Sequence, residues 1–104
     1  MSSERMVGLD IIDEGAYSSY REGMLPILKK YGGAFRYDFR IAETLRSETP
    51  AAINRVFLLT FPTREAKTAF FADPGYLAVR ERYFKPSVRA ATVIAEFERP
   101  NPER

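Results

Sequence analysis

The chain has 104 residues, of which 45% are hydrophobic and 29% are charged, and its formal net charge is +2. A chain of this length predicts a single domain. It contains neither cysteine nor histidine, which excludes disulfides, thiol nucleophiles, thiolate metal sites and the commonest general base. The composition still permits an oxygen-ligated Mg²⁺ or Ca²⁺ site, but the acidic residues are scattered and predict no metal site. We expect no cofactor.

Charge is spread along the chain, as where Glu81 separates Arg80 from Arg82. A protein that binds nucleic acid concentrates its basic residues on one face, so we expect no nucleic-acid partner. Residues 1–5 lack the apolar segment of a signal peptide. Apolar runs such as Val56–Leu59 are far too short to cross a membrane. These features predict a cytoplasmic protein without a membrane partner.

The first part of the chain predicts a strand followed by a helix. The strand spans residues 6–12, and Asp13 is a suitable N-cap for the helix. Apolar residues then recur at helical spacing up to the pair Gly32-Gly33, where Gly32 suits the left-handed conformation that ends many helices. Pro26 lies inside this segment and is expected to kink its last turns.

Residues 34–45 alternate between apolar and charged side chains, which predicts a second strand. This alternation places Arg36, Asp38 and Arg40 on one face of the strand. It places Phe35, Tyr37, Phe39 and Ile41 on the other face. A third strand is predicted at residues 55–61, where a dense apolar run ends at Pro62.

The remaining segments predict a second helix and a fourth strand. Thr63 caps the helix, an Asp-Pro-Gly sequence at residues 73–75 interrupts it, and Lys85-Pro86 ends it. The fourth strand spans residues 88–97. This order of elements is typical of the ferredoxin-like βαββαβ fold, an α+β fold in which both helices cover one face of a four-stranded antiparallel sheet. We expect one domain over residues 6–98, with flexible tails at residues 1–5 and 99–104.

The strands carry apolar side chains on both faces, although the helices can cover only one of them. In the third strand, Val56 and Leu58 alternate with Phe57, Leu59 and Phe61. In the fourth strand, Ile94 is expected to share a face with Thr92 and Glu96, opposite Ala91, Val93, Ala95 and Phe97. An exposed apolar sheet face usually marks an interface. We therefore predict a homodimer that associates sheet to sheet. The alternative is a monomer whose C-terminal residues cover this face.

Four segments of the chain resemble one known family. They are the acidic cap with two tyrosines in residues 13–21, Tyr31-Gly32-Gly33 followed by Phe35, residues 61–66, and residues 70–76 followed by Arg80. Together they resemble the uncharacterised family catalogued as domain of unknown function 1330, in the dimeric α+β barrel superfamily. The resemblance spans about residues 7–97. It implies a ferredoxin-like fold and a dimer, and it implies no established reaction.

Two sets of residues are candidates for a functional site. In the predicted charged row, Arg36 and Arg40 could hold an anion while Asp38 acts as a base. The alternative is a solvated edge strand whose charges prevent aggregation. The second set could line a small-molecule pocket, or it could belong to the core. It consists of Tyr17, Tyr20, Tyr76 and Tyr83 with Arg80. Asp10 and Glu96 are acids in apolar strands, and each is expected to pair with an arginine or to face the edge of the dimer.

These observations leave three functions open, two without catalysis and one enzymatic. The first is a small homodimeric protein that binds an anionic or aromatic ligand between sheet and helices. Its ligand-binding candidates are Tyr17, Tyr20, Arg36, Arg40 and Arg80. The second is a cofactor-independent oxygenase or isomerase, as in related dimeric barrels, with Asp38 and Tyr76 as catalytic candidates. The third is a structural or protein-interaction module, which predicts the absence of a sizeable pocket.

Overall fold

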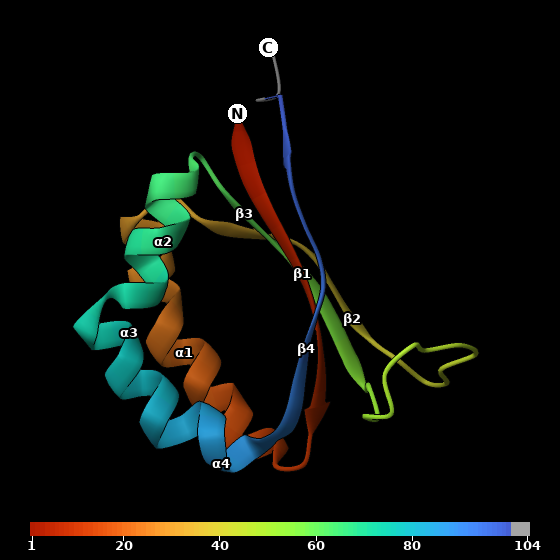
Figure 1. The fold of residues 1–104 in the computed structure, drawn as a ribbon. Helices are drawn as coiled ribbons and strands as arrows, with labels where there is room; N and C mark the ends of the chain where they lie inside the picture. Colours follow the sequence, from red (N-terminus) through yellow and green to blue (C-terminus); the bar gives the residue numbers. More distant parts are fainter. Residues whose placement is uncertain (101–104) are drawn as a thin grey trace.

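A four-stranded sheet and a layer of helices form the structure, a computed structural model that describes residues 1–100 (Figure 1). The strands are β1 (Ser2–Ile11), β2 (Ala34–Arg40), β3 (Arg55–Phe61) and β4 (Val88–Arg99). The helices are α1 (Glu14–Lys30), α2 (Arg64–Ala72), α3 (Pro74–Val79), the π-helical turn η1 (Arg80–Phe84) and the short α4 (Lys85–Ser87). None of these helices is long and apolar enough to cross a membrane.

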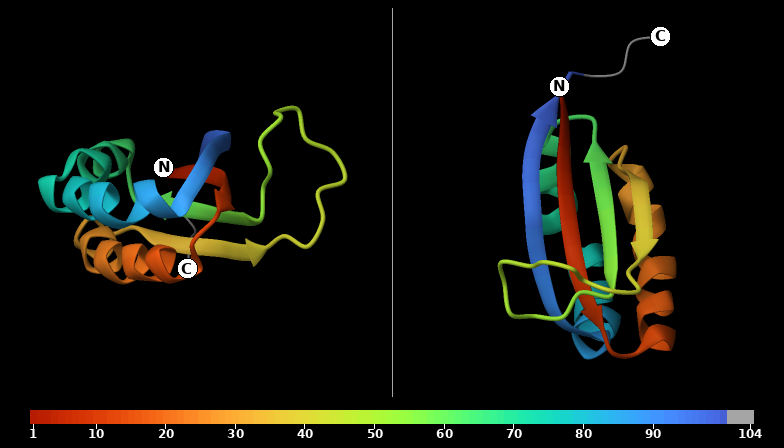
Figure 2. Two further views of the ribbon diagram at one scale, coloured as in Figure 1. Left: turned by 90° about the horizontal axis from the view of Figure 1, so that it is seen from below. Right: turned by 90° about the vertical axis from the view of Figure 1, so that its right-hand side faces the viewer.

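The strands pair antiparallel in the order β2-β3-β1-β4. The helices lie on one face of this sheet, and none of the described helices covers the opposite face, which we call the open face (Figures 1 and 2). The predicted ferredoxin-like α+β fold is therefore confirmed.

Helices α1 and α2 begin at the predicted caps and α1 ends at the predicted glycine pair, but the last helical segment continues to Ser87, so the end predicted at Lys85-Pro86 is wrong. Asp13 caps α1 by accepting a hydrogen bond from the backbone N–H of Ala16 at 3.0 Å. Thr63 caps α2 in the same way through the N–H of Ala66, also at 3.0 Å. After α1, Gly32 has a φ of 75°, a conformation that glycine adopts without a steric penalty.

Strand β1 begins earlier than predicted. It starts at Ser2, and its first residues pair with both β3 and β4. Glu4 is fully buried there. The predicted flexible tail at residues 1–5 is therefore wrong, because polar side chains of this segment find partners across the sheet. Strand β4 likewise continues to Arg99, and residues 101–104 of the second predicted tail lie outside the described residues.

Strand β2 ends at Arg40, before the predicted end at residue 45. A loop over residues 41–54 follows, and it projects from the open face (Figure 2). Its ends are joined by a hydrogen bond of 2.9 Å from the N–H of Ile41 to the carbonyl of Asn54. Ile53 lies close to Gly8 of β1, where a Cβ would be 3.0 Å from the Ile53 side chain. The loop thus covers part of the open face.

A β-bulge at Arg36 changes the faces predicted for the second strand. Residues directly opposite each other in antiparallel strands share a face. Phe35 lies opposite Leu59, but Tyr37 lies opposite Leu58, so Arg36 is the extra residue. Phe35 therefore faces the helices, whereas Tyr37 and Phe39 lie on the open face. The prediction that they share one face is wrong.

The same bulge divides the predicted charged row. Arg36 lies on the open face, where it binds the carboxylate of Glu4 at 3.2 Å. Asp38 lies opposite Phe57 and faces the helix side of the sheet, as does Arg40. The three charged residues are therefore not one row on one face.

A second bulge lies at Ile94 of β4. Met6 is opposite Ala95 and the next residue, Val7, is opposite Val93. Ala95 and Phe97 therefore lie on the open face, and Glu96 lies on the helix side opposite Arg5. The prediction that Ala95 and Phe97 share a face with Val93, and Glu96 with Ile94, is wrong beyond the bulge.

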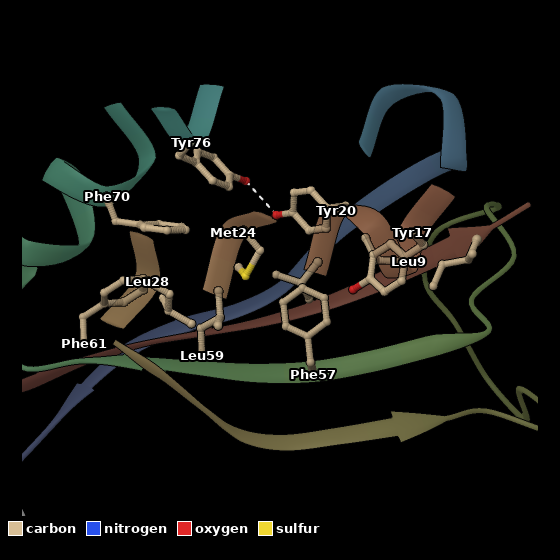
Figure 3. Close-up of a cluster of buried hydrophobic side chains, with 12 residues drawn as sticks. Leu9, Tyr17, Tyr20, Met24, Leu28, Phe57, Leu59, Phe61, Phe70 and Tyr76 are labelled. Carbon is tan, nitrogen blue, oxygen red and sulfur yellow. Dashed lines mark hydrogen bonds between the residues drawn. The ribbon is translucent and has the colours of Figure 1, made fainter. Parts of the chain in front are cut away.

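The hydrophobic core lies between the helices and the sheet (Figure 3). Strands β1 and β3 contribute Val7, Leu9, Ile11, Phe57, Leu59 and Phe61, and the helices contribute Tyr17, Tyr20, Met24, Leu28, Phe70 and Tyr76. Tyr17 and Tyr20 of α1 are part of this core, and together with Tyr76 of α3 they bring three hydroxyl groups to the space between the two layers.

Candidate ligand-binding site

A cavity of about 390 Å³ lies between the sheet and the helices. Sixteen residues line it, and seven of them are aromatic: Tyr17, Tyr20, Phe35, Phe57, Phe71, Tyr76 and Phe84. The exposed side chains of Leu77 and Val93 mark where the cavity meets solvent. Small-molecule sites in proteins have volumes of about 300–1,000 Å³ and mostly apolar walls. The size and lining of this cavity therefore suit a small, largely apolar molecule.

Two buried tyrosines from different helices meet at the wall of the cavity. The hydroxyl oxygens of Tyr20 in α1 and Tyr76 in α3 are 2.9 Å apart (Figure 3). Asp73 positions Tyr76, because its carboxylate accepts hydrogen bonds from the N–H groups of Gly75 and Tyr76 and so caps α3. The short helix thus directs the Tyr76 side chain toward α1.

Burial raises the pKa of Tyr20 well above its ordinary value, and the neighbouring Tyr76 raises it further. Burial also raises the pKa of Tyr17 and of Tyr76. At Tyr76, the hydrogen bond with Tyr20 and the positive charges of Arg80 and Arg5 act in the opposite direction. All three hydroxyls therefore stay protonated near neutral pH, where they can donate hydrogen bonds to a ligand and are unsuited to act as bases.

Two arginines line the cavity, and their surroundings differ. The Arg5 guanidinium lies 4.2 Å from the centre of the Phe71 ring and donates a hydrogen bond of 2.7 Å to Glu96. The Arg80 guanidinium lies 5.3 Å from the centre of the Phe84 ring. Within residues 1–100, no carboxylate lies within 4.0 Å of its nitrogens. Because none of the described residues that line the cavity is acidic, its electrostatic character is positive.

Asp38 lies outside the cavity lining, in a network with two arginines. It accepts hydrogen bonds from Arg55 at 2.8 and 3.1 Å and from Arg21 at 2.9 Å. Arg21 also donates to the Tyr17 hydroxyl at 2.9 Å. Partial burial opposes ionisation of Asp38, but the hydrogen bonds and charges of the two arginines outweigh it and lower its pKa. Such a carboxylate is a weak base, which favours a positioning role for Asp38.

The structure brings together four of the predicted site residues and separates the others. Tyr17, Tyr20, Tyr76 and Arg80 line the same cavity. Tyr83 packs against the core outside the lining. Arg36 lies on the open face, and Arg40 is exposed opposite Arg55.

Several cavity residues were not predicted from the sequence, among them Arg5 and the phenylalanines at positions 35, 57, 71 and 84. The polar composition of residues 1–5 predicts a tail at Arg5, whereas alternation with Val7 and Leu9 places it on their face of the strand. Asp10 and Glu96, the two acids of the apolar strands, are both paired with an arginine. Asp10 accepts a hydrogen bond from Arg89 at 2.9 Å, and Glu96 accepts one from Arg5.

Within residues 1–100, no three acidic side chains are grouped so that they could hold a metal ion. The polar groups that the cavity lining offers are its tyrosine hydroxyls and its two arginines.

Solved structures resemble this chain over almost its whole length. A protein of unknown function from Rhodopseudomonas palustris superposes with a TM-score of 0.81 at 15% identity, covering 97% of this chain and 84% of the other. A dimeric protein of unknown function with a ferredoxin-like fold, from Bacteroides fragilis, has a TM-score of 0.63 at 10% identity, with 93% and 95% covered. A protein from Nitrosomonas europaea described as a candidate antibiotic biosynthesis monooxygenase has a TM-score of 0.66 at 12% identity, with 97% and 91% covered. At these identities the likeness concerns the fold.

No curated protein matches the chain in sequence. Residues 6–97 match the family described as "Domain of unknown function (DUF1330)". Because this match spans most of the chain, the protein belongs to that family, as the four sequence segments predicted.

Proposed function

We propose that this member of the DUF1330 family is a homodimer that binds a small, largely apolar molecule in the cavity between its sheet and helices. The cavity carries the proposal. Protein interiors are normally close-packed, and unfilled space lowers stability. A cavity of about 390 Å³ lined by seven aromatic side chains is therefore unexpected in a module that serves only as a scaffold or a protein-binding surface. Occupation by a ligand accounts for it.

The homodimer is supported by the side chains of the open face. Tyr37, Phe39, Ile94 and Phe97 are 52%, 51%, 45% and 42% exposed, respectively. All four lie on or beside the face without helices. Burial of such side chains against the same face of a second copy removes apolar surface from water and creates a two-fold interface. The protein of this fold from Bacteroides fragilis is described as dimeric.

Light scattering on the purified protein tests the dimer. We expect twice the chain mass for the wild type and the monomer mass for Phe39→Glu, because this substitution places a charge in the proposed interface. The matched control is Leu25→Glu, since Leu25 is 38% exposed on α1, on the helix side of the molecule. It should remain dimeric. A monomeric wild type, or dimers in both variants, would contradict the sheet-to-sheet arrangement.

Native mass spectrometry on freshly purified protein tests for a retained ligand. We expect an added small-molecule mass on the dimer, which release under denaturing conditions would identify. Ala91→Phe fills part of the cavity and should abolish this mass. Ala78→Phe adds the same ring at an exposed position of α3 outside the cavity lining and should retain it. Retention of the mass by Ala91→Phe would show that the ligand lies elsewhere.

A cofactor-independent enzyme is the second candidate, and one observation favours it. The neutral hydroxyl of Tyr76 and the positive charge of Arg80 act in the same part of the cavity. Hydrogen-bond donors and charges of this kind stabilise an oxyanion in a transition state. Incubation of the retained molecule with wild type and Tyr76→Phe tests this role. Loss of turnover with binding preserved would support catalysis, and equal turnover would exclude Tyr76 from it.

A further inference from the structure

We propose that the ligand of the cavity is an aromatic acid with a single negative charge, whose carboxylate is held by Arg80 and the hydroxyl of Tyr76. This inference rests on the proposed function, because it names the chemical class of the molecule bound in the same cavity.

The first argument is the charge of Arg80. Most arginines within residues 1–100 form an ion pair with a carboxylate, namely Arg5, Arg21, Arg36, Arg55, Arg64, Arg89 and Arg99. Of the others in this part of the chain, Arg40, Arg46 and Arg82 are exposed to water, whereas Arg80 is half-buried and lines the cavity. A charge that is partly removed from water is stabilised by a partner of opposite sign. The planar guanidinium of arginine matches the geometry of a carboxylate.

The second argument is an unused hydrogen in the tyrosine pair. Each tyrosine hydroxyl has one hydrogen, so the contact between Tyr20 and Tyr76 uses one hydrogen and leaves one free. Either hydroxyl can donate in this pair, and Tyr20 donates to the Tyr76 oxygen when a carboxylate beside Arg80 accepts from Tyr76. The hydrogen of Tyr76 is then available to a ligand. The Tyr76 hydroxyl and the Arg80 guanidinium together supply donors for the two oxygens of one carboxylate.

The third argument is the shape of η1 and of the cavity wall. Arg80 and Phe84 are the first and last residues of this π-helical turn, and both line the cavity. Such turns are rare and occur frequently at functional sites. The seven aromatic side chains offer faces and edges to a planar ring. Among the described residues that line the cavity, one cation is unpaired and none is acidic, so the cavity matches one negative charge, because a second carboxylate would be buried without a partner.

Isothermal titration calorimetry with two probes of equal shape tests the proposal. The probes are naphthoate and the neutral naphthalenemethanol. We expect the wild type to bind naphthoate more tightly than naphthalenemethanol. Arg80→Gln should lower the affinity for naphthoate by about 10- to 100-fold, as expected for the loss of a hydrogen bond to a charged group. Binding of naphthalenemethanol should change by less than about threefold. The control is Arg82→Gln on the same turn, which should bind both probes as the wild type does.

Each other outcome decides the matter. Equal affinity for both probes, unaffected by Arg80→Gln, overturns the inference and leaves the proposed function standing. Binding of neither probe by the wild type removes the proposed ligand site together with the inference. If Arg80→Gln binds neither probe, Arg80→Lys tests whether the charge is responsible, because this variant keeps the positive charge. Partial recovery of naphthoate binding in Arg80→Lys supports the inference, and no recovery overturns it.

Discussion

The hydrogen bond between Tyr20 and Tyr76 makes a sharp prediction about stability. Both side chains are buried and their hydroxyl oxygens are 2.9 Å apart. Tyr20→Phe keeps the ring and leaves the Tyr76 hydroxyl without this partner. An unpaired buried hydroxyl lowers stability by about 1–3 kcal/mol. Because both residues also line the cavity, where water can take up part of the loss, we expect each single Phe variant to lower the free energy of unfolding by about 1–2 kcal/mol.

The double variant Tyr20→Phe/Tyr76→Phe should be no less stable than either single variant, because replacing both partners by apolar groups of the same shape is close to neutral. Urea unfolding gives the free energy of unfolding of the wild type, the two single variants and the double variant. All four are measured at one protein concentration, because association makes stability depend on concentration. The control is Tyr83→Phe, because the Tyr83 hydroxyl makes no side-chain hydrogen bond within residues 1–100. It should change stability by less than about 0.5 kcal/mol. A double variant that loses the sum of the two single losses would refute the direct bond between the hydroxyls.

Two further predictions concern the ends of the sheet and acid unfolding. Glu4→Ala should lower the free energy of unfolding by about 2–3 kcal/mol, because the fully buried carboxylate accepts a hydrogen bond from Thr60 at 2.5 Å. The control Glu98→Ala removes an exposed ion pair and should lower the free energy of unfolding by less than about 1 kcal/mol. If urea unfolding shows equal losses of stability for the two variants, the result contradicts a strand that begins at Ser2. The hydrogen bond from Tyr31, together with those from Lys30 and from the backbone N–H groups of Gly75 and Tyr76, lowers the pKa of Asp73 from 3.8 to about 2. The ionised carboxylate therefore stabilises the fold above pH 4, and this contribution is lost as the pH falls towards 2. Tyr31→Phe should therefore move acid unfolding, followed by circular dichroism, to higher pH, and an unchanged midpoint would contradict this role of Tyr31.

The order of the elements could be predicted because each signal acts within a few residues of the chain. Asp13 and Thr63 cap helices through side-chain contacts to N–H groups three residues later. Gly32 ends α1 through its own backbone conformation. Such contacts do not depend on the rest of the fold, so the sequence indicates them and, through them, the fold class.

The faces of the edge strands could not be predicted, because a bulge is defined by the partner strand. The alternation of apolar and charged residues continues through Arg36 without interruption. Only the pairing with β3 reveals the extra residue, and every side chain after it changes face. For a similar reason the sequence predicts a tail at Glu4, since its partners Thr60 and Arg36 are distant in sequence.

Only part of the candidate site could be predicted, because some of its contacts join residues that are distant in sequence. Helical spacing correctly grouped Tyr17 and Tyr20 on one face of α1. The contact between Tyr20 and Tyr76 joins residues 56 positions apart, and only the packing of α3 against α1 creates it. Arg5 was missed because its strand begins earlier than its polar composition indicates.

The bulge at Ile94 connects the open face of the sheet with the chemistry of the cavity. Beyond it, Phe97 lies on the open face, and Glu96 lies on the helix side, where it accepts the hydrogen bond from Arg5. In a regular strand these two side chains would exchange faces, because successive residues point to opposite sides. Glu96 would then be unable to neutralise Arg5, and Arg5 would compete with Arg80 for an anion. One inserted residue therefore has two consequences. It leaves Arg80 as the unpaired cation among the described residues of the cavity. It also places the apolar side chain of Phe97 on the face to which we expect a second copy to bind.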